Sequence, residues 1–266
     1  MANAAFLIQL LLGVAAAFGG RWLGGKPRNV WITAAMIGAA VALGVLATRF
    51  WPVTAVHTLG APLTACIEVT AWGIPTVLVL AIGSRQLPRE RDRRAMWLLV
   101  ALGGGFAIKS GLWMITPPLR PAGPVNMQNG VCRQTSDATC VAASMTTMLF
   151  AHGVDTTEEE MASLAMTDSG GASEARAIWA LQRRLAATSW RPEYGTMDVA
   201  SLAAVPKPCI VTLRWGLLVS HMVAVMSMDE TTVTLGDPLA GVRVVTREQF
   251  AQDWRGRAIW LKRDGQ

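Results

Sequence analysis

Long apolar runs alternate with short polar segments over the first 115 residues of the chain. Four of these runs, at 2–20, 30–48, 63–83 and 96–115, contain few charged residues. A transmembrane helix requires about 20 predominantly apolar residues. The pattern therefore predicts an all-α membrane domain of four transmembrane helices over residues 1–115. The first run is expected to stay in the protein, because the initial MANAAFLIQ lacks the positively charged residues of a signal peptide and three more apolar runs follow.

The pattern changes after a Pro- and Gly-rich stretch at 116–130, which predicts a linker. Apolar residues then follow helical spacing from 140 to 150, and two more helices are predicted at about 157–165 and 173–186. Short β-branched segments follow at 209–215, 221–229, 231–238 and 242–248. A short helix at 248–254 and a strand at 258–263 complete the pattern. Helices followed by antiparallel strands predict an α+β domain over residues 131–266.

The basic residues account for the formal net charge of +6, and their positions also predict the orientation of the chain in the membrane. Arg21, Lys26 and Arg28 follow the first apolar run, and five arginines follow the third, whereas the segment after the second run carries only Arg49. Loops rich in Lys and Arg stay in the cytoplasm. We therefore expect a bacterial-type inner-membrane protein with its N-terminus and its 131–266 domain outside the cytoplasm. No basic face with interleaved aromatic residues is present, so nucleic-acid binding is not expected.

Two charged residues lie inside predicted spans, Glu68 in the third and Lys109 in the fourth. At a rise of about 1.5 Å per residue, both lie roughly 8 to 9 Å below the outer ends of their helices. An unpaired charge in hydrocarbon costs several kcal/mol, so we predict an intramembrane ion pair between them. The pair is interpreted as structural, with two alternatives: a polar floor beneath a substrate route, or side chains that reach the interface without contact.

The sequence predicts no metal or nucleotide cofactor. The four cysteines and three histidines show no metal-ligand spacing. The segment GRWLGGKP at 20–27 resembles a phosphate-binding loop, but Pro27 replaces the hydroxyl residue that would hold magnesium. Whether Cys132 and Cys209 form a disulfide is left open by the sequence.

Cys140 is a candidate nucleophile because it begins a predicted helix, where the positive end of the helix dipole stabilises a thiolate. His221 opens a strand further along the chain, and Asp237 follows sixteen residues later. Two antiparallel strands joined by a turn would place Asp237 beside His221. Gln134 precedes Cys140 by six residues, where its amide could donate to an oxyanion together with the Cys140 N–H. Taken singly, each residue also fits a structural role, and a helical cysteine is most often a buried hydrophobe.

The arrangement resembles the bacteriocin-processing, double-glycine leader peptidases, which are papain-like cysteine peptidases often fused to exporters. The likeness covers residues 132–262 and includes the Gln134-to-Cys140 spacing, the ASMTTMLFAHG helix, the SHMVAV strand and the LGDP turn. It implies that Cys140 is the nucleophile, His221 the general base and acid, Asp237 the orienting carboxylate and Gln134 the oxyanion donor. The chain departs from the family at Val141, because the family has glycine after the nucleophile.

The resulting prediction is a membrane-anchored cysteine endopeptidase that cleaves a peptide or leader segment through a Cys140 thioacyl intermediate. Small residues such as Gly-Gly are the candidate cleavage motif. The expected partners are a peptide or protein substrate, the lipid bilayer and a separate exporter. Three alternatives remain: a peptide-binding module that does not cut, a transferase that passes the acyl group to an acceptor other than water, and a channel or transporter formed by the membrane domain.

Overall fold

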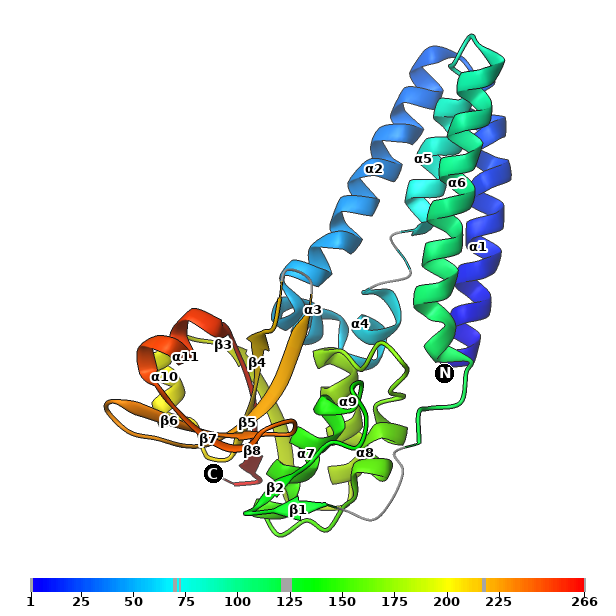
Figure 1. Cartoon of the computed structure of the whole chain (residues 1–266). Helices are drawn as coiled ribbons and strands as arrows, with labels where there is room; N and C mark the ends of the chain where they lie inside the picture. The colour runs from blue at the N-terminus through cyan, green and yellow to red at the C-terminus, as the bar shows by residue number, and fades with distance from the viewer. Residues whose placement is uncertain (1, 69–70, 72, 121–125, 217–218, 266) are drawn as a thin grey trace. The chain divides into compact units, whose positions relative to one another are not determined.

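The computed structural model describes residues 2–68, 71, 73–120, 126–216 and 219–265. The chain divides into two compact units, Met1–Thr116 and Pro117–Gln266. The first unit is helical, and the second combines helices with a sheet (Figure 1). We call them the helical unit and the peptidase-like unit.

The helical unit contains six α-helices and one 3₁₀ turn among its described residues. They are α1 (Ala2–Leu23), α2 (Arg28–Phe50), α3 (Pro52–Leu59), α4 (Ala61–Ile67), α5 (Gly73–Ser84), α6 (Glu90–Gly111) and η1 (Leu112–Met114). Within the described part of this unit, three stretches are long and apolar enough to cross a membrane: Ala2–Leu23, Arg28–Thr48 and Glu90–Met114. The α5 helix packs against α1, α2 and α6. Gly20 permits the approach of α1 to α5, since a Cβ at Gly20 would lie 2.7 Å from the Ala81 Cβ.

The prediction of one continuous span at 63–83 was wrong. The α4 helix ends at Ile67, and α5 begins anew at Gly73 and has only 12 residues. Proline lacks an N–H and is tolerated only in the first turn of a helix, so Pro75 favours a new helix start close to Gly73. A helix of this length spans about 18 Å, which is less than the roughly 30 Å of a hydrocarbon core.

Glu68 lies at the C-terminus of α4 and is 6% exposed, whereas the Lys109 side chain in α6 is exposed. The predicted ion pair between these two residues remains a prediction.

The peptidase-like unit confirms the predicted order of helices followed by an antiparallel sheet. Its first three helices are α7 (Cys140–Ala151), α8 (Glu158–Leu164) and α9 (Glu174–Leu185). The side chains of Thr157 and Ser173 accept hydrogen bonds from first-turn N–H groups of α8 and α9, which fixes where these helices begin. A small hairpin of β1 (Met127–Gln128) and β2 (Val131–Cys132) precedes α7.

Six antiparallel strands form the main sheet in the order β3-β8-β4-β5-β6-β7. Their bounds are β3 (Trp190–Thr196), β8 (Trp254–Arg263), β4 (Cys209–Arg214), β5 (Ser220–Met228), β6 (Thr232–Asp237) and β7 (Gly241–Thr246). Two short helices, α10 (Val199–Ala204) and α11 (Arg247–Asp253), complete the unit. The β3 strand and α10 were not predicted, and Trp254, predicted to end a helix, begins β8.

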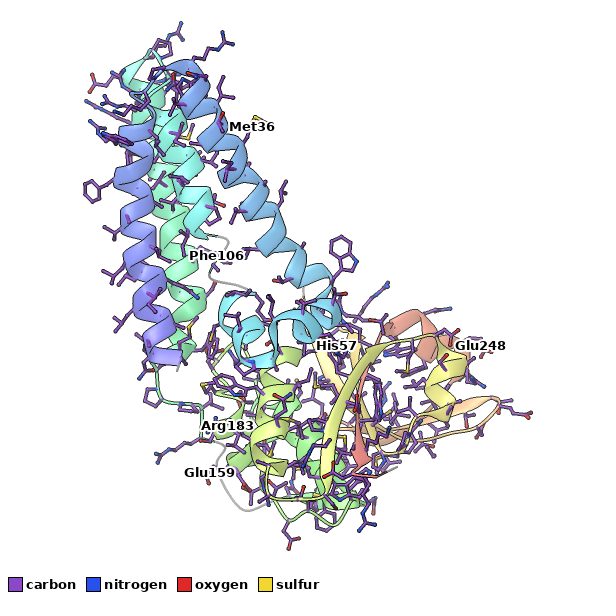
Figure 2. The ribbon with its side chains drawn as sticks, turned by 180° about the vertical axis from the view of Figure 1, so that it is seen from behind. Met36, His57, Phe106, Glu159, Arg183 and Glu248 are labelled. Atoms are coloured by element: carbon purple, nitrogen blue, oxygen red, sulfur yellow. The ribbon has the colours of Figure 1, made fainter. Side chains whose placement is uncertain are left out.

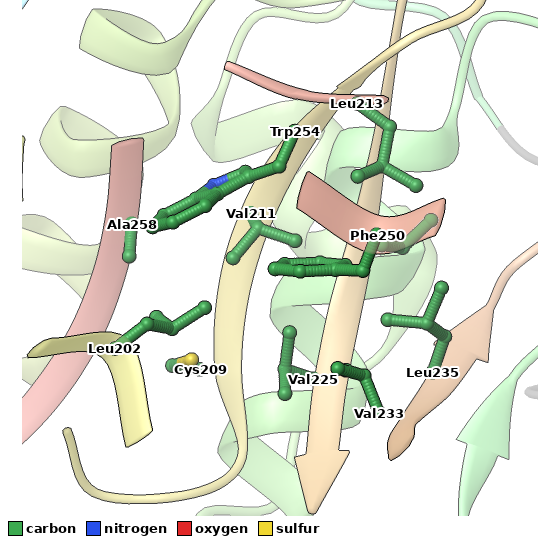
Figure 3. Packing of buried hydrophobic residues seen from close by; sticks show 11 residues of the cluster. Leu202, Cys209, Val211, Leu213, Val225, Val233, Leu235, Phe250, Trp254 and Ala258 are labelled. Atoms are coloured by element: carbon green, nitrogen blue, oxygen red, sulfur yellow. The ribbon is translucent and has the colours of Figure 1, made fainter. Parts of the chain in front are cut away.

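The core of the peptidase-like unit is built on both faces of β4 and β5. Residues 209–213 of β4 are all buried, as are residues 221–225 of β5. On one face, side chains from α10 and α11 close a hydrophobic cluster, in which the rings of Phe250 and Trp254 stack at 5.3 Å between centroids (Figure 3). The α7 helix packs against β5 and β4. A cysteine at the start of α7 is thereby fixed relative to the two central strands.

Candidate active site

Cys140 is the first residue of α7, as predicted, and its thiol is free and partly exposed. The rest of the helix is buried from Val141 to Leu149. Backbone N–H groups in the first turn of a helix have no partner within it and give this end a positive potential. The Ser144 hydroxyl, one turn further, donates a hydrogen bond of 2.9 Å to the carbonyl of Met222 in β5. This bond ties the helix to the strand that carries His221.

His221 and Asp237 form a buried pair. His221 is 4% exposed and Asp237 is 1% exposed. The His221 Nε2 lies 2.8 Å from the Asp237 Oδ1. The short connection between β5 and β6 brings them together, because the Asp229 carboxylate accepts hydrogen bonds from the N–H groups of Thr231 and Thr232 and closes the turn.

The electrostatics of the pair favour its charged form. Burial lowers the pKa of His221, but hydrogen bonds with Asp237 and Cys140 and the nearby negative charges outweigh it and raise the pKa to about 9. Burial raises the pKa of Asp237, yet hydrogen bonds from His221 and the Leu239 N–H lower it to about 2. The raised pKa favours the imidazolium form of His221 at neutral pH, with Asp237 and Cys140 as the two groups that stabilise it.

Gln134 lies in the loop between β2 and α7, beside the turn that follows Asp237. Its backbone N–H donates to the Pro238 carbonyl at 3.0 Å. Its side-chain Nε2 donates to the Ser136 carbonyl at 2.7 Å, and its Oε1 is buried with no hydrogen-bond partner among the described residues. The structure thus brings all four predicted residues into one region, with Gln134 attached to the Asp237 turn.

Three residues that contact the site were not predicted. Arg243 donates to the Asp237 Oδ2 at 3.2 Å. Arg133 donates to the carbonyls of Pro238, at 3.1 Å, and Leu239. The Trp215 ring lies 4.7 Å from the His221 ring, centroid to centroid. Of these three residues, only Arg243 could have been predicted from the sequence. A tight turn after Asp237 pairs Asp237 with Gly241 on the next strand. Arg243 is two residues beyond Gly241 and therefore lies on the same face of the sheet as Asp237.

The other cysteines of this unit differ from Cys140. Cys132 and Cys209 are free and fully buried, so they form no disulfide here. Burial raises the pKa of each thiol to about 12, which keeps both protonated and unreactive. Among the described residues, no group of three or more His, Cys, Asp or Glu side chains is placed to hold a metal ion.

Curated relatives align with the second half of the chain. An uncharacterized protein of Methanothermobacter thermautotrophicus is 34% identical over 135 residues, which cover 50% of this chain and 88% of that protein. The uncharacterized protein MTBMA_c00490 of Methanothermobacter marburgensis is 29% identical over 135 residues, covering 50% of this chain and 89% of that protein.

Two solved structures are also similar to this half. The peptidase domain of Streptococcus ComA, described as a bi-functional ABC transporter involved in a quorum sensing pathway, is 20% identical. The alignment covers 50% of this chain and 96% of that domain, with a TM-score of 0.45. A double glycine motif protease from an AMS/PCAT transporter, solved in complex with the leader peptide, is 18% identical. The alignment covers 54% of this chain and 94% of that protease, with a TM-score of 0.44.

A family model gives the assignment. The model described as the Peptidase C39 family matches residues 128–265. This match takes in just over half of the chain and every residue of the candidate site. The chain therefore belongs to the Peptidase C39 family, with apolar helices in front of the family's domain.

Proposed function

We propose that this chain is a membrane-anchored cysteine endopeptidase with Cys140 as its nucleophile. One observation carries the proposal: a buried His221 lies 2.8 Å from the Asp237 carboxylate and interacts with Cys140, which begins helix α7. A cysteine between a helix N-terminus and an imidazolium is in the environment that favours a reactive thiolate. Cys140 is also only half-buried, so a substrate can reach it.

The residues have defined roles in the proposed reaction. The Cys140 sulfur attacks the carbonyl carbon of the scissile peptide, and the carbonyl oxygen takes up the negative charge. The His221 imidazolium gives its proton to the leaving amine as the C–N bond breaks, which leaves a thioester on Cys140. Water then attacks the thioester, His221 removes a proton from that water, and the acid product leaves with the thiolate restored.

Two donors would stabilise the oxyanion. The backbone N–H of Cys140 lies in the first turn of α7, where such groups lack helical partners. The Gln134 amide carries two N–H bonds, of which one is used on the Ser136 carbonyl, so the second can donate to the substrate. Donors fixed before the reaction cost no reorganisation when the charge develops. The Gln134 loop is fixed in this way through its hydrogen bond to Pro238.

The proposed substrate is a peptide or leader segment with small residues such as Gly-Gly before the cleaved bond. The leader peptide bound to the AMS/PCAT transporter protease supports this class. Val141, which replaces the family's glycine, is 4% exposed. The Val141 side chain is packed in the interior, so it leaves Cys140 open to a substrate. A separate exporter is the proposed partner that removes the product.

We further propose four membrane crossings, with α4 and α5 together forming the third. The loops that follow α1 and α5 lie at the same end of the helical unit, because Gln86 Nε2 donates to the Gly24 carbonyl at 2.7 Å. The α2 helix leads away from this end, so the chain has to return to it before Arg85. With both basic loops in the cytoplasm, the peptidase domain lies outside the cytoplasm.

Labelling of Cys140 tests the chemistry and the topology together. Intact cells that express the full chain are treated with a membrane-impermeant iodoacetamide, and labelled sites are located by mass spectrometry. We expect Cys140 to react at least tenfold faster in the wild type than in His221→Ala, while Cys132 and Cys209 stay unlabelled. Equal and slow labelling in both proteins would reject the peptidase and favour peptide binding without cleavage. Labelling only after permeabilisation would reject the orientation alone.

A cleavage assay tests the substrate class. The purified chain is incubated with a synthetic leader peptide that contains a Gly-Gly pair, and the products are identified by mass spectrometry. We expect cleavage after Gly-Gly by the wild type and none by Cys140→Ala. The matched control is a peptide in which both glycines are replaced by valine.

A further inference from the structure

The positive charge of the chain is concentrated at one end of the helical unit, around the loops that follow α1 and α5. Eight basic residues lie there against two acidic ones, Glu90 and Asp92, which gives a formal net charge of +6. The whole chain also has a net charge of +6, so the remaining residues are neutral in sum. We call this group the basic end; its basic residues are Arg21, Lys26, Arg28, Arg85, Arg89, Arg91, Arg93 and Arg94.

Contacts between the two loops hold these charges on one surface. Arg85 Nε donates to the Arg21 carbonyl at 3.4 Å, and Gln86 Nε2 donates to the Gly24 carbonyl at 2.7 Å. A Cβ at Gly24 would lie 2.8 Å from the Arg85 Cβ, so the absence of a side chain there permits the close approach. Figure 2 shows nitrogen-tipped side chains gathered at this end of the helical unit. The basic residues of two segments far apart in sequence therefore form one surface.

Few of these charges are compensated within the protein. Arg94 pairs with Glu90 at 2.5 Å. Among the residues that the structure describes, no carboxylate lies within ion-pair distance of Arg28, Arg89 or Arg91, and all three are exposed. Like charges on one surface repel each other, and a bound anion would relieve that repulsion.

Tryptophans place the basic end at the depth of lipid headgroups. Trp22, Trp31 and Trp97 lie near the ends of α1, α2 and α6 that carry the basic residues. Trp22 is 62% exposed, and the Lys26 Nζ lies 4.0 Å from the centroid of its ring. Indole rings that are exposed at the end of an apolar helix favour the membrane–water interface. The guanidinium groups beside them would lie in the same layer as lipid phosphates.

We propose that the basic end binds the headgroups of anionic phospholipids. A guanidinium group can donate two parallel hydrogen bonds to a phosphate, and two preformed loops offer several such groups at once. Clusters of four to eight Lys or Arg next to a membrane helix favour anionic lipid. The inference rests on the membrane anchoring in the proposed function, but it does not depend on the peptidase chemistry.

Lipid titration of the full-length chain tests the proposal. The purified protein in an uncharged detergent is titrated with fluorescently labelled phosphatidylglycerol and, separately, with phosphatidylcholine, at low and at high salt. We expect at least tenfold tighter binding of phosphatidylglycerol at low salt, with the preference reduced at high salt. Equal binding of the two lipids would overturn the proposal, as would full displacement of phosphatidylglycerol by soluble glycerophosphate at the same concentration.

A charge-matched pair of variants assigns the preference to the basic end. The test variant carries Arg28→Gln, Arg89→Gln and Arg91→Gln, and the control carries the same change at three exposed positions of the peptidase-like unit, Arg120, Arg214 and Lys262. We expect the preference to disappear in the test variant and to persist in the control. An unchanged preference in the test variant would overturn the proposal.

Folding and peptidase chemistry are monitored separately in the same samples. Circular dichroism reports the helix content of each variant, and the rate of Cys140 alkylation reports the candidate active site. We expect both to match the wild type in the test variant. Slow alkylation in the wild type would reject the peptidase proposal while the lipid preference could still be measured, so the two failures are distinguishable.

Discussion

Replacing Asp237 by asparagine removes one negative charge beside His221 but keeps an oxygen that can accept its hydrogen bond. The wild-type pKa of His221 is about 9, against an ordinary value of 6.5. The difference corresponds to about 3 kcal/mol in favour of the imidazolium, at roughly 1.4 kcal/mol per pH unit. Solvent screens this interaction little, because the His221 side chain is only 6% exposed.

The expected change in the pKa of His221 follows from which groups stabilise the imidazolium. Burial of His221 opposes protonation, and only Asp237 and Cys140 offset it. Asparagine would remove the charge of Asp237, and the Arg243 guanidinium, 3.2 Å from the Asp237 Oδ2, would stay beside the site without compensation. We therefore expect the pKa of His221 to fall by at least about one pH unit in Asp237→Asn, a tenfold loss in proton affinity.

Histidine NMR measures this change directly. The chain contains three histidines, so ¹³C-histidine labelling of the protein in detergent gives three signals, and His57→Gln and His152→Gln assign them. Glu230→Gln is the matched control, because it removes the same charge from an exposed position close to the turn. A His221 signal that titrates at the same pH in Asp237→Asn and in the wild type would refute the reasoning. So would a wild-type signal that titrates below the ordinary histidine value.

Three further outcomes are expected from the contacts described above. Because the pKa of His221 is raised from 6.5 to about 9, its contribution to stability is complete below pH 6.5 and is lost as pH rises through 9. The contribution of its carboxylate partner is present above pH 3.8 and is lost as pH falls through about 2. The difference in urea midpoint between the wild type and His221→Gln should therefore be largest between these limits and shrink at either extreme. Ser144→Ala removes a buried hydrogen bond between α7 and β5 and should cost about 1 to 3 kcal/mol in the free energy of unfolding; exposed Ser163→Ala is the control, and equal urea midpoints would contradict the argument. Gly20→Ala places a Cβ 2.7 Å from α5 atoms and should lower the melting temperature of the helical unit, whereas Gly19→Ala, with no atom within 4 Å, should not.

The sequence was sufficient for local structure, but contacts between distant segments were harder to predict. The α7 helix and the strands from β4 to β7 follow from apolar spacing and from turn residues. The β3 strand was missed because Pro192 and Gly195 are unfavourable in a strand, and only its place at the edge of the sheet tolerates them. The break in the predicted third span could have been read from Gly73 and Pro75.

The candidate site shows the same difference between local structure, which could be predicted, and contacts between distant segments, which were harder to predict. The order and spacing of Cys140, His221 and Asp237 led to the prediction that they lie together, because each stands at the start or end of an element that the pattern predicts. Arg133 could not be found in this way, since its partners are backbone carbonyls of a turn more than 100 residues later. A backbone acceptor is present at every residue, so it gives no sequence signal.

The place of β8 in the sheet has a consequence for biosynthesis. This strand follows every other strand of the sheet in sequence, yet it lies inside the sheet between β3 and β4. During translation, β4 therefore has one unpaired edge until residues 254–263 have left the ribosome. The strands that carry His221 and Asp237 rest on an incomplete sheet for that whole period. The candidate active site therefore has its complete supporting sheet only once residues 254–263 have been synthesised.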